Sequence, residues 1–187
     1  MTAIVAIHTP KFTVIAADTL FVGAGRFYGH KLTKVGGGNL VLGEAGAMGP
    51  ICRRIQKQWA KIDTVADLRA AIIAHANSVE THEMDAHVVG GDIVQESILV
   101  ASREGICSLD NSGSRTEALP LTRNTYVEAV GCGRPDTLGY VFGFMQNAPK
   151  NFLDSAERVS VLLTEAINHT ARFDSGVGGA VDVEVIR

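Results

Sequence analysis

Residues 2–18 read Thr-Ala-Ile-Val-Ala-Ile-His-Thr-Pro-Lys-Phe-Thr-Val-Ile-Ala-Ala-Asp, and this stretch decides the fold. Residues 3–8 and 12–17 are short runs rich in Ile, Val and Ala, a composition that favours β-strands. Pro10 stands between the two runs, in a segment that suits a turn. The stretch therefore predicts a hairpin whose second strand leads directly into the carboxylate of Asp18.

The rest of the chain alternates between segments typical of strands and of helices. A second hairpin is predicted around Gly36-Gly-Gly-Asn39. Two helices should follow, because apolar residues recur at helical spacing, with Thr64 as the N-cap of the second. Residues 20–30 and 83–96 show no regular period. The predicted strands lie at about 32–35, 40–42, 97–102, 105–109, 126–130 and 180–186, and the helices at about 51–62, 65–79, 135–146 and 153–172. This order is typical of sheets stacked between helical layers.

Length and composition indicate one globular domain, which we expect to span residues 1–187. A chain of 187 residues can bury a substantial core. Its content of 46% hydrophobic and 20% charged residues is ordinary for a globular protein. The formal net charge of −3 provides no basic field for nucleic acid, so we expect no nucleic-acid partner.

We expect a cytoplasmic protein that has no membrane segment, no metal and no cofactor. The start of the chain lacks the pattern of a signal peptide, and no window approaches the roughly 18–20 apolar residues of a membrane span. Cys52, Cys107 and Cys132 form no Cys-x-x-Cys pair, which indicates reduced thiols rather than a disulfide framework or a zinc site. His82 and His87 are five residues apart, a spacing that does not share one helical face, so a solvated loop is favoured over a metal site.

Thr2 follows the initiator Met1, and removal of Met1 would place a hydroxyl and an α-amine on one residue. The second residue is small enough for this removal. The amine, with a reference pKa of roughly 7.7–8.0, can then serve as the general base for the hydroxyl. The sequence therefore predicts an N-terminal threonine nucleophile.

Several further motifs stand in order behind Thr2: Asp18 at the end of a strand, Lys34, Gly43-Glu-Ala-Gly46, Gly131-Cys-Gly133, and Asp174-Ser-Gly-Val-Gly-Gly. This arrangement resembles the proteasome β-subunit family, including the bacterial HslV peptidase, across essentially the whole chain. The resemblance implies an α+β fold, a four-layer αββα sandwich. It also implies threonine-type endopeptidase activity.

The resemblance assigns a role to each motif. Lys34 would keep the Thr2 amine neutral, because a nearby positive charge disfavours a second protonation, and Asp18 would orient that lysine. The backbone N–H of Gly43 would face the oxyanion, and Asp174 would orient the proton-transfer network. Taken alone, Lys34 is more often a surface lysine and Asp18 a turn residue. Their joint spacing from Thr2 favours the catalytic interpretation.

Two positions depart from the family pattern. Val177 and Cys132 stand where the family usually has serines. A thiol is a weaker hydrogen-bond donor than a hydroxyl, so Cys132 would hold the Thr2 amine less firmly. Cys132 could instead be a nucleophile, but no histidine stands near it in sequence and it lies in a glycine turn.

A pocket for the P1 side chain, the residue on the N-terminal side of the cut bond, follows from the same comparison. Its predicted residues are apolar: Phe21, Leu32, Val41 and Ala45. Burying an apolar P1 group among them could contribute roughly 1.5–3 kcal/mol. We therefore expect preference for apolar P1 residues.

The resemblance as a whole implies a threonine peptidase that forms a homo-oligomeric ring and acts on peptides or unfolded proteins. The family resemblance implies a separate ATP-dependent unfoldase as partner. Two alternatives stay open: an assembly subunit without catalytic activity, and an N-terminal nucleophile enzyme that hydrolyses a non-peptide amide.

Overall fold

The computed structural model describes residues 2–22, 26–46, 61–76, 88–89, 92–93, 97–110 and 112–187. Most of the first predicted helix, residues 51–62, lies outside the described residues, as do Cys52, His82 and His87.

The first sheet has five strands and contains both halves of the predicted N-terminal hairpin. In sheet order the strands are β12 (Leu119–Thr122), β13 (Thr125–Val130), β1 (Ile4–His8), β2 (Thr13–Asp18) and β14 (Val181–Ile186). Every neighbouring pair is antiparallel. The N-terminal strand is therefore central, and the C-terminal strand closes one edge.

The second sheet also has five antiparallel strands. In order they are β11 (Arg115–Glu117), β10 (Ile106–Asp110), β9 (Ser97–Ser102), β6 (Leu40–Ala45) and β5 (Leu32–Val35). The 3-10 helix η1 (Gly36–Gly38) joins β5 to β6. Two short hairpins stand apart from the sheets: β3 (Leu20–Val22) with β4 (Arg26–Tyr28), and β7 (Val88–Val89) with β8 (Asp92–Ile93).

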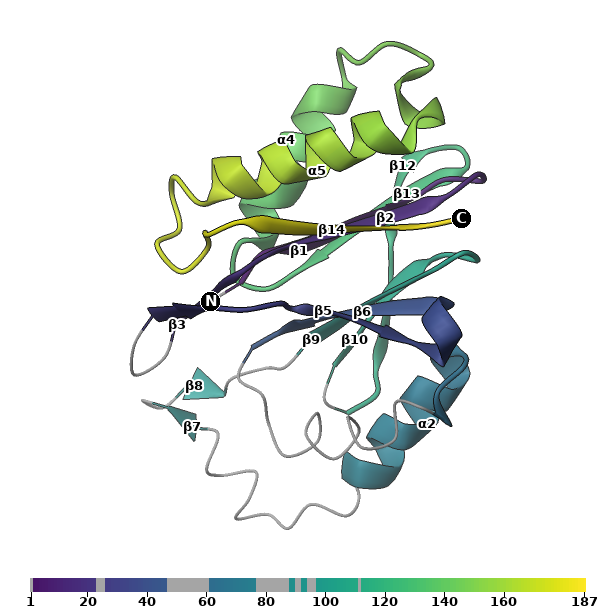
Figure 1. The fold of residues 1–187 in the computed structure, drawn as a ribbon, viewed down its shortest axis with the longest axis vertical. Coiled ribbons are helices and arrows are strands. Elements are labelled where there is room, and N and C mark those ends of the chain that lie inside the picture. Colours follow the sequence, from purple (N-terminus) through teal and green to yellow (C-terminus); the bar gives the residue numbers. More distant parts are fainter. Residues whose placement is uncertain are drawn as a thin grey trace.

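The helices cover the outer faces of the two sheets (Figure 1). Helices α4 (Arg134–Met145) and α5 (Ala156–Thr170) lie on the first sheet, with the 3-10 helix η3 (Phe152–Asp154) before α5. Helix α2 (Val65–Ala76) lies on the second sheet. The predicted α+β fold, a four-layer αββα sandwich, is thus confirmed.

The apolar run of β1 is explained by burial on both faces. Val5 and Ile7 point toward α4 and α5, whereas Ile4 and Ala6 point into the core between the sheets. Successive side chains of a strand alternate between faces, so a strand with two buried faces needs apolar residues throughout. The same holds for β2, in which all six residues are buried.

Side chains cap the N-terminal ends of two helices, and the Thr64 cap was predicted from the sequence. The hydroxyl of Thr64 accepts a hydrogen bond from the N–H of Asp67 at 3.1 Å, and the Asp67 carboxylate accepts one from the N–H of Thr64 at 3.0 Å. This reciprocal pair satisfies donors at the start of α2. Ser155 caps α5 by accepting from the N–H of Arg158 at 3.3 Å.

The structure adds six described strands that the sequence analysis did not predict, among them the short pair β7 and β8 in the segment 83–96. β3 and β4 form a hairpin in the segment 20–30, where no regular period was found. β11 and β12 are short edge strands whose residues are nearly all exposed. An exposed strand carries no alternation of apolar and polar residues, so its sequence gives little signal.

Candidate active site

Thr2 lies directly before β1, at the end of the sandwich that also holds the loop after α5 (Figure 1). Thr2 is 5% exposed. The Thr2 N–H donates to the Sγ of Cys132 at 3.3 Å, and the Thr2 carbonyl accepts from the N–H of Gly133 at 3.3 Å. Gly131 has a φ of +96°, and a Cβ on it would collide with the Thr2 carbonyl oxygen. The Gly131-Cys132-Gly133 turn therefore touches Thr2 closely along its backbone.

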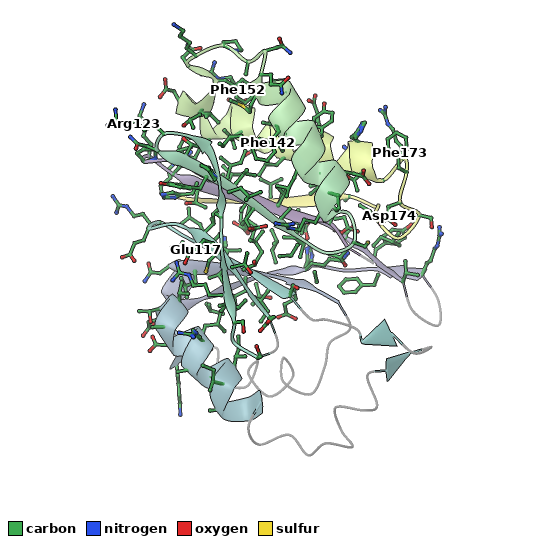
Figure 2. All side chains as sticks on the ribbon, turned by 180° about the vertical axis from the view of Figure 1, so that it is seen from behind. Glu117, Arg123, Phe142, Phe152, Phe173 and Asp174 are labelled. Carbon is green, nitrogen blue, oxygen red and sulfur yellow. The ribbon has the colours of Figure 1, made fainter. Side chains whose placement is uncertain are left out.

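Cys132 connects Thr2 to Asp174. Its thiol donates to the Oδ2 of Asp174 at 2.8 Å, while the other carboxylate oxygen accepts from the N–H of Gly176 at 2.8 Å. Partial burial, and next the hydrogen bond to Asp174, raise the pKa of the Cys132 thiol above its ordinary value of 9.0. Asp174 lies in the loop after α5, at the opposite end of the molecule from Arg123 (Figure 2). The thiol thus stays protonated at neutral pH and bridges the Thr2 nitrogen to a carboxylate.

Asp18 is fully buried at the end of β2, and both of its carboxylate oxygens accept hydrogen bonds. One oxygen accepts from the N–H of Ala3 at 2.9 Å and from the ammonium of Lys31 at 2.8 Å. The other accepts from the N–H of Gly178 at 3.2 Å. Asp18 therefore ties together the residue after Thr2, a buried lysine and the glycine pair of the C-terminal motif.

Lys31 is the lysine that meets Asp18, and its side chain is only 1% exposed. The ammonium also donates to the carbonyl of Leu20 at 2.5 Å and lies 4.9 Å from the centre of the Phe21 ring. Burial lowers the pKa of Lys31, and the hydrogen bond and charge of Asp18 oppose that shift. The negative charge that a Cys132 thiolate would carry acts in the same direction as Asp18. Lys31 is thus electrostatically coupled to both Asp18 and Cys132.

Lys34 lies elsewhere, which corrects the prediction that Asp18 orients it. Its ammonium pairs with Glu184 of β14 at 2.7 Å, and the two side chains are 58% and 34% exposed. Lys34 lies within the edge strand β5, whereas Lys31 precedes that strand. The spacing counted from Thr2 pointed to Lys34. The residue that reaches Asp18 is Lys31, three positions earlier.

Gly43 lies at the interface between the two sheets, and its backbone N–H is directed at the neighbouring strand β9. The N–H of Glu44 donates to Lys31 on the β5 side. Because successive residues of a strand direct their hydrogen bonds to opposite sides, Gly43 points toward its β9 partner, Leu99. A Cβ on Gly43 would come 2.6 Å from the Cγ2 of Ile4. The geometry explains a glycine here by close packing rather than by an N–H open to a substrate.

The four predicted pocket residues occupy different environments. Phe21 and Leu32 are half-buried, and Leu32 packs against the inter-sheet core. Ala45 is 5% exposed at the end of β6, whereas Val41 is 1% exposed inside that core. Phe21, Leu32 and Ala45 thus lie on segments that start or end beside Lys31, and Val41 is a core residue two positions before Gly43.

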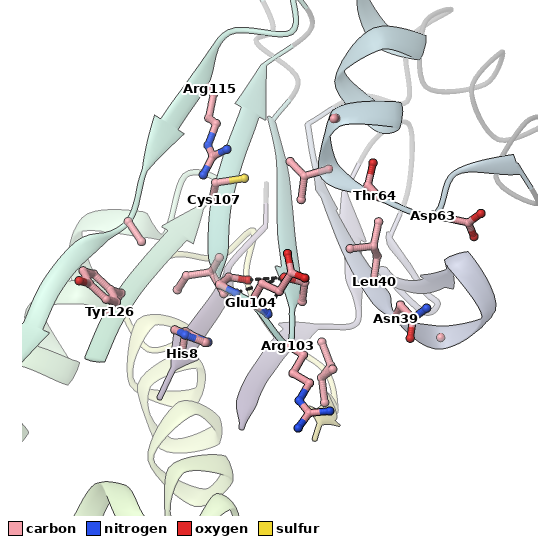
Figure 3. A pocket seen from close by; sticks show the side chains of 18 of the residues that line it. His8, Asn39, Leu40, Asp63, Thr64, Arg103, Glu104, Cys107, Arg115 and Tyr126 are labelled. Atoms are coloured by element: carbon pink, nitrogen blue, oxygen red, sulfur yellow. Dashed lines mark hydrogen bonds between the residues drawn. The ribbon is translucent and has the colours of Figure 1, made fainter. Parts of the chain in front are cut away.

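A separate pocket of about 1060 Å³ opens at the other end of the sandwich (Figure 3). His8 lines it, at the end of β1 opposite to Thr2. His8 is six positions after Thr2, which in an extended chain corresponds to roughly 20 Å. The ring of Tyr126 stacks on His8 with centroids 6.5 Å apart. This pocket is therefore distinct from the surroundings of Thr2.

In the part of the chain that the structure describes, no group of three or more His, Cys, Asp or Glu side chains is arranged to hold a metal ion. None of the helices described there is long and apolar enough to cross a membrane.

Comparison with known proteins gave structural matches only. No family model matches the chain, and no curated protein is significantly similar to it. The crystal structure of eukaryotic HslV from Trypanosoma brucei matches with a TM-score of 0.65 at 17% identity, over 99% of both chains. Thiobacillus denitrificans BPH matches with a TM-score of 0.68 at 18% identity, over 98% of this chain and 96% of that one. BPH in complex with epoxomicin gives a TM-score of 0.67 at 21% identity, over 98% and 97%.

These matches span nearly the full length of both chains. They agree with the two stacked sheets and their helical layers. Over nearly its whole length, the chain has an HslV-like fold.

Proposed function

We propose that this chain is a threonine-type peptidase subunit whose nucleophile is Thr2 after removal of Met1. One observation carries the proposal: two separate polar systems converge on the Thr2 backbone. The Cys132–Asp174 pair reaches the Thr2 nitrogen, and the buried Asp18–Lys31 pair reaches the next backbone nitrogen, that of Ala3.

The proposed reaction uses the two groups of Thr2 itself. The freed α-amine accepts the hydroxyl proton as the Thr2 oxygen attacks the carbonyl carbon of a peptide bond. The same proton then passes to the leaving amine, and water hydrolyses the ester that remains on Thr2. Cys132 would hold the amine through its sulfur, and Asp174 would hold Cys132.

The positive charge of Lys31 would disfavour protonation of the Thr2 α-amine, and so keep that amine neutral. Lys31 replaces Lys34 in this role, because Lys31 is the one that Asp18 holds in the buried interior. A charge that lies away from bulk water acts more strongly on its neighbours than an exposed one.

The oxyanion donor that we propose is the N–H of Gly46 rather than that of Gly43. Gly46 lies two residues beyond Glu44, whose N–H points to Lys31, so strand alternation directs the Gly46 N–H to the same side. Gly46 has a φ of +110° and follows the last residue of β6. A donor at a strand end leaves room for a substrate carbonyl.

The comparisons support the peptidase proposal without identifying a substrate. One matched protein is an HslV, and another structure holds epoxomicin. We further propose a homo-oligomeric ring in the cytoplasm, a peptide or unfolded-protein substrate, and a separate ATP-dependent unfoldase. These three proposals extend the family resemblance to this chain.

A non-catalytic assembly subunit is the second candidate, and Val177 favours it. Its side chain is 3% exposed and packs in the core under α4 and α5, at a place where the family resemblance would put a serine. No hydroxyl at position 177 can therefore join the proton network.

Fluorogenic peptides with apolar, basic and acidic P1 residues test the proposal. We expect turnover by a preparation that intact mass shows to begin at Thr2, and none by Thr2→Ala. Best turnover after an apolar residue would support the pocket of Phe21, Leu32 and Ala45. An active preparation that retains Met1 quantitatively would refute the mechanism, and hydrolysis of simple amides but not peptides would favour the non-peptide alternative.

A further inference from the structure

Beside the Gly131-Cys132-Gly133 turn, the buried Glu128 of β13 forms an ion pair with Arg134, whose side chain is 42% exposed. Glu128 is 0% exposed, and its Oε1 accepts from the Nε of Arg134 at 3.1 Å and from the N–H of Ala129 at 2.9 Å. The same Arg134 nitrogen donates to the carbonyl of Ala129 at 2.9 Å. Glu128 and Arg134 therefore bind the backbone N–H and the carbonyl of Ala129, and we call this pair of side chains the clasp.

Strand alternation explains why Ala129 needs partners there. The N–H of Asp18 donates to the carbonyl of Ala3, so Ile4 and Ala6 direct their hydrogen bonds toward β13. Their partners in β13 are Val130 and Glu128, which leaves Ala129 facing the opposite side.

On that opposite side, β12 ends its pairing at Leu119, which faces Val127. The ladder of hydrogen bonds stops one pair short of Ala129. Glu128 and Arg134 take the place of the missing strand at the last residues before the turn.

One oxygen of this arrangement is left without a partner among the described residues, which reduces its contribution to stability. Among the described residues, the Oε2 of Glu128 is a buried side-chain oxygen with no hydrogen-bond partner. Burial of an unpaired polar atom is unfavourable.

We propose that Glu128 and Arg134 are positioning residues that hold the Gly131-Cys132-Gly133 turn and, through it, the nitrogen of Thr2. The proposal rests on the proposed function of Thr2. The turn itself is fixed at both ends, since the N–H of Arg134 donates to Gly131 at 3.1 Å and that of Gly133 donates to Thr2. Arg134 thus joins the clasp to the turn directly.

The reactivity of the Cys132 thiol tests the proposal independently of peptidase activity. In Arg134→Ala the loosened turn should let the thiol leave Asp174, so that its pKa falls back toward the ordinary value. A lower pKa would increase the thiolate fraction, partly offset by lower intrinsic nucleophilicity, so alkylation should be about threefold faster. Iodoacetamide labelling, followed by mass spectrometry of the Cys132 peptide at neutral pH, measures this rate.

Arg115→Ala is the control, because Arg115 is an arginine of similar exposure that pairs with a glutamate, Glu117, at 2.9 Å. That pair lies on β11, in the sheet that does not contain β1 and β13. Arg115→Ala should leave both the alkylation rate and peptide turnover unchanged. Glu128→Gln, a milder change than removal of the side chain, should reproduce the effect of Arg134→Ala in a folded protein.

In an active enzyme, Arg134→Ala should lower kcat about tenfold with little change in KM, because it displaces the proton acceptor rather than the substrate. Faster Cys132 alkylation without any peptidase activity would support the clasp and count only against the proposed function. An alkylation rate equal to that of the wild type in both Arg134→Ala and Glu128→Gln would overturn the proposal.

Discussion

Lys31 and Lys34 are three residues apart, and each forms one ion pair, yet the two pairs belong to different physical environments. The distances are almost equal, 2.8 Å for Lys31–Asp18 and 2.7 Å for Lys34–Glu184. The first pair is about 1% exposed or less, and the second is 58% and 34% exposed. Distance alone would therefore rank them as equivalent, whereas burial makes only the first a strong electrostatic element.

The difference has opposite consequences for stability and for chemistry. An exposed pair exchanges water contacts for little net gain. A buried pair brings two charges out of water, so that loss of either partner leaves a charge uncompensated. The chain retains such a pair beside Thr2, which is the reason to look for function there.

Removal of Lys31 should give the largest effect on activity. Lys31→Ala should lower peptide turnover by about 100-fold or more, because the Thr2 amine loses the charge that keeps it neutral. Lys34→Ala should stay near the wild-type rate. Circular dichroism must show that both variants are folded. Loss of activity in Lys34→Ala with full activity in Lys31→Ala would reverse the assignment.

Stability should separate the same two positions. Lys31→Met leaves Asp18 charged in the interior and should cost about 3–5 kcal/mol in the free energy of unfolding. Lys34→Met should cost about 0–1 kcal/mol, as is usual for an exposed pair. Urea unfolding measures both values, and equal losses in the two variants would show that burial does not distinguish the pairs.

A volume change can extend the comparison from charge to packing. Gly43→Ala should destabilise the protein by about 1–3 kcal/mol, because the new methyl group would overlap Ile4 across the sheets. Ala substitution of Gly139, whose Cβ position meets no atom within 4 Å, is the control and should be neutral or slightly stabilising. A tolerated Gly43→Ala would argue against the tight inter-sheet contact.

The pH profile of Cys132→Ser gives the smallest predicted change. The pKa of the Cys132 thiol is raised above 9.0, so the wild-type thiol keeps its proton at neutral pH and loses it only in alkaline solution. Deprotonation would place a second negative charge beside Asp174 and remove the donor. Turnover by the wild type should therefore fall above about pH 9, whereas Cys132→Ser, whose hydroxyl does not titrate there, should retain its rate.

Much of the fold could be predicted from sequence because the main strands are buried on both faces. β1, β2, β9 and β13 are nearly continuous apolar runs, and α5 has a clear helical period with a capping serine. The edge strands β11 and β12 escaped prediction because exposed residues do not reveal a strand by their pattern.

The sequence indicated which segments meet at the site, but not which lysine of the segment 31–34 contacts Asp18. The structure links Thr2, Cys132 and Asp174 by hydrogen bonds and ties Asp18 to the residue after Thr2, and the catalytic roles of these residues stay a prediction. The sequence analysis paired Asp18 with Lys34, whereas the structure pairs Asp18 with Lys31, because a count of residues cannot show where an irregular segment such as 20–31 crosses the site. The Glu128–Arg134 clasp was missed because a glutamate inside a strand gives no sign that it is buried.

Covalent labelling with epoxomicin tests the central claim most directly, namely that Thr2 is the nucleophile and Lys31 its charged neighbour. The wild type, Thr2→Ala, Lys31→Ala and Lys34→Ala would be incubated with the inhibitor and analysed by intact mass, with the adduct located by peptide fragmentation. We expect an adduct on Thr2 in the wild type and in Lys34→Ala, and none in Thr2→Ala or Lys31→Ala. An adduct on another residue, or labelling of Lys31→Ala at the wild-type rate while Lys34→Ala stays unlabelled, would contradict the account.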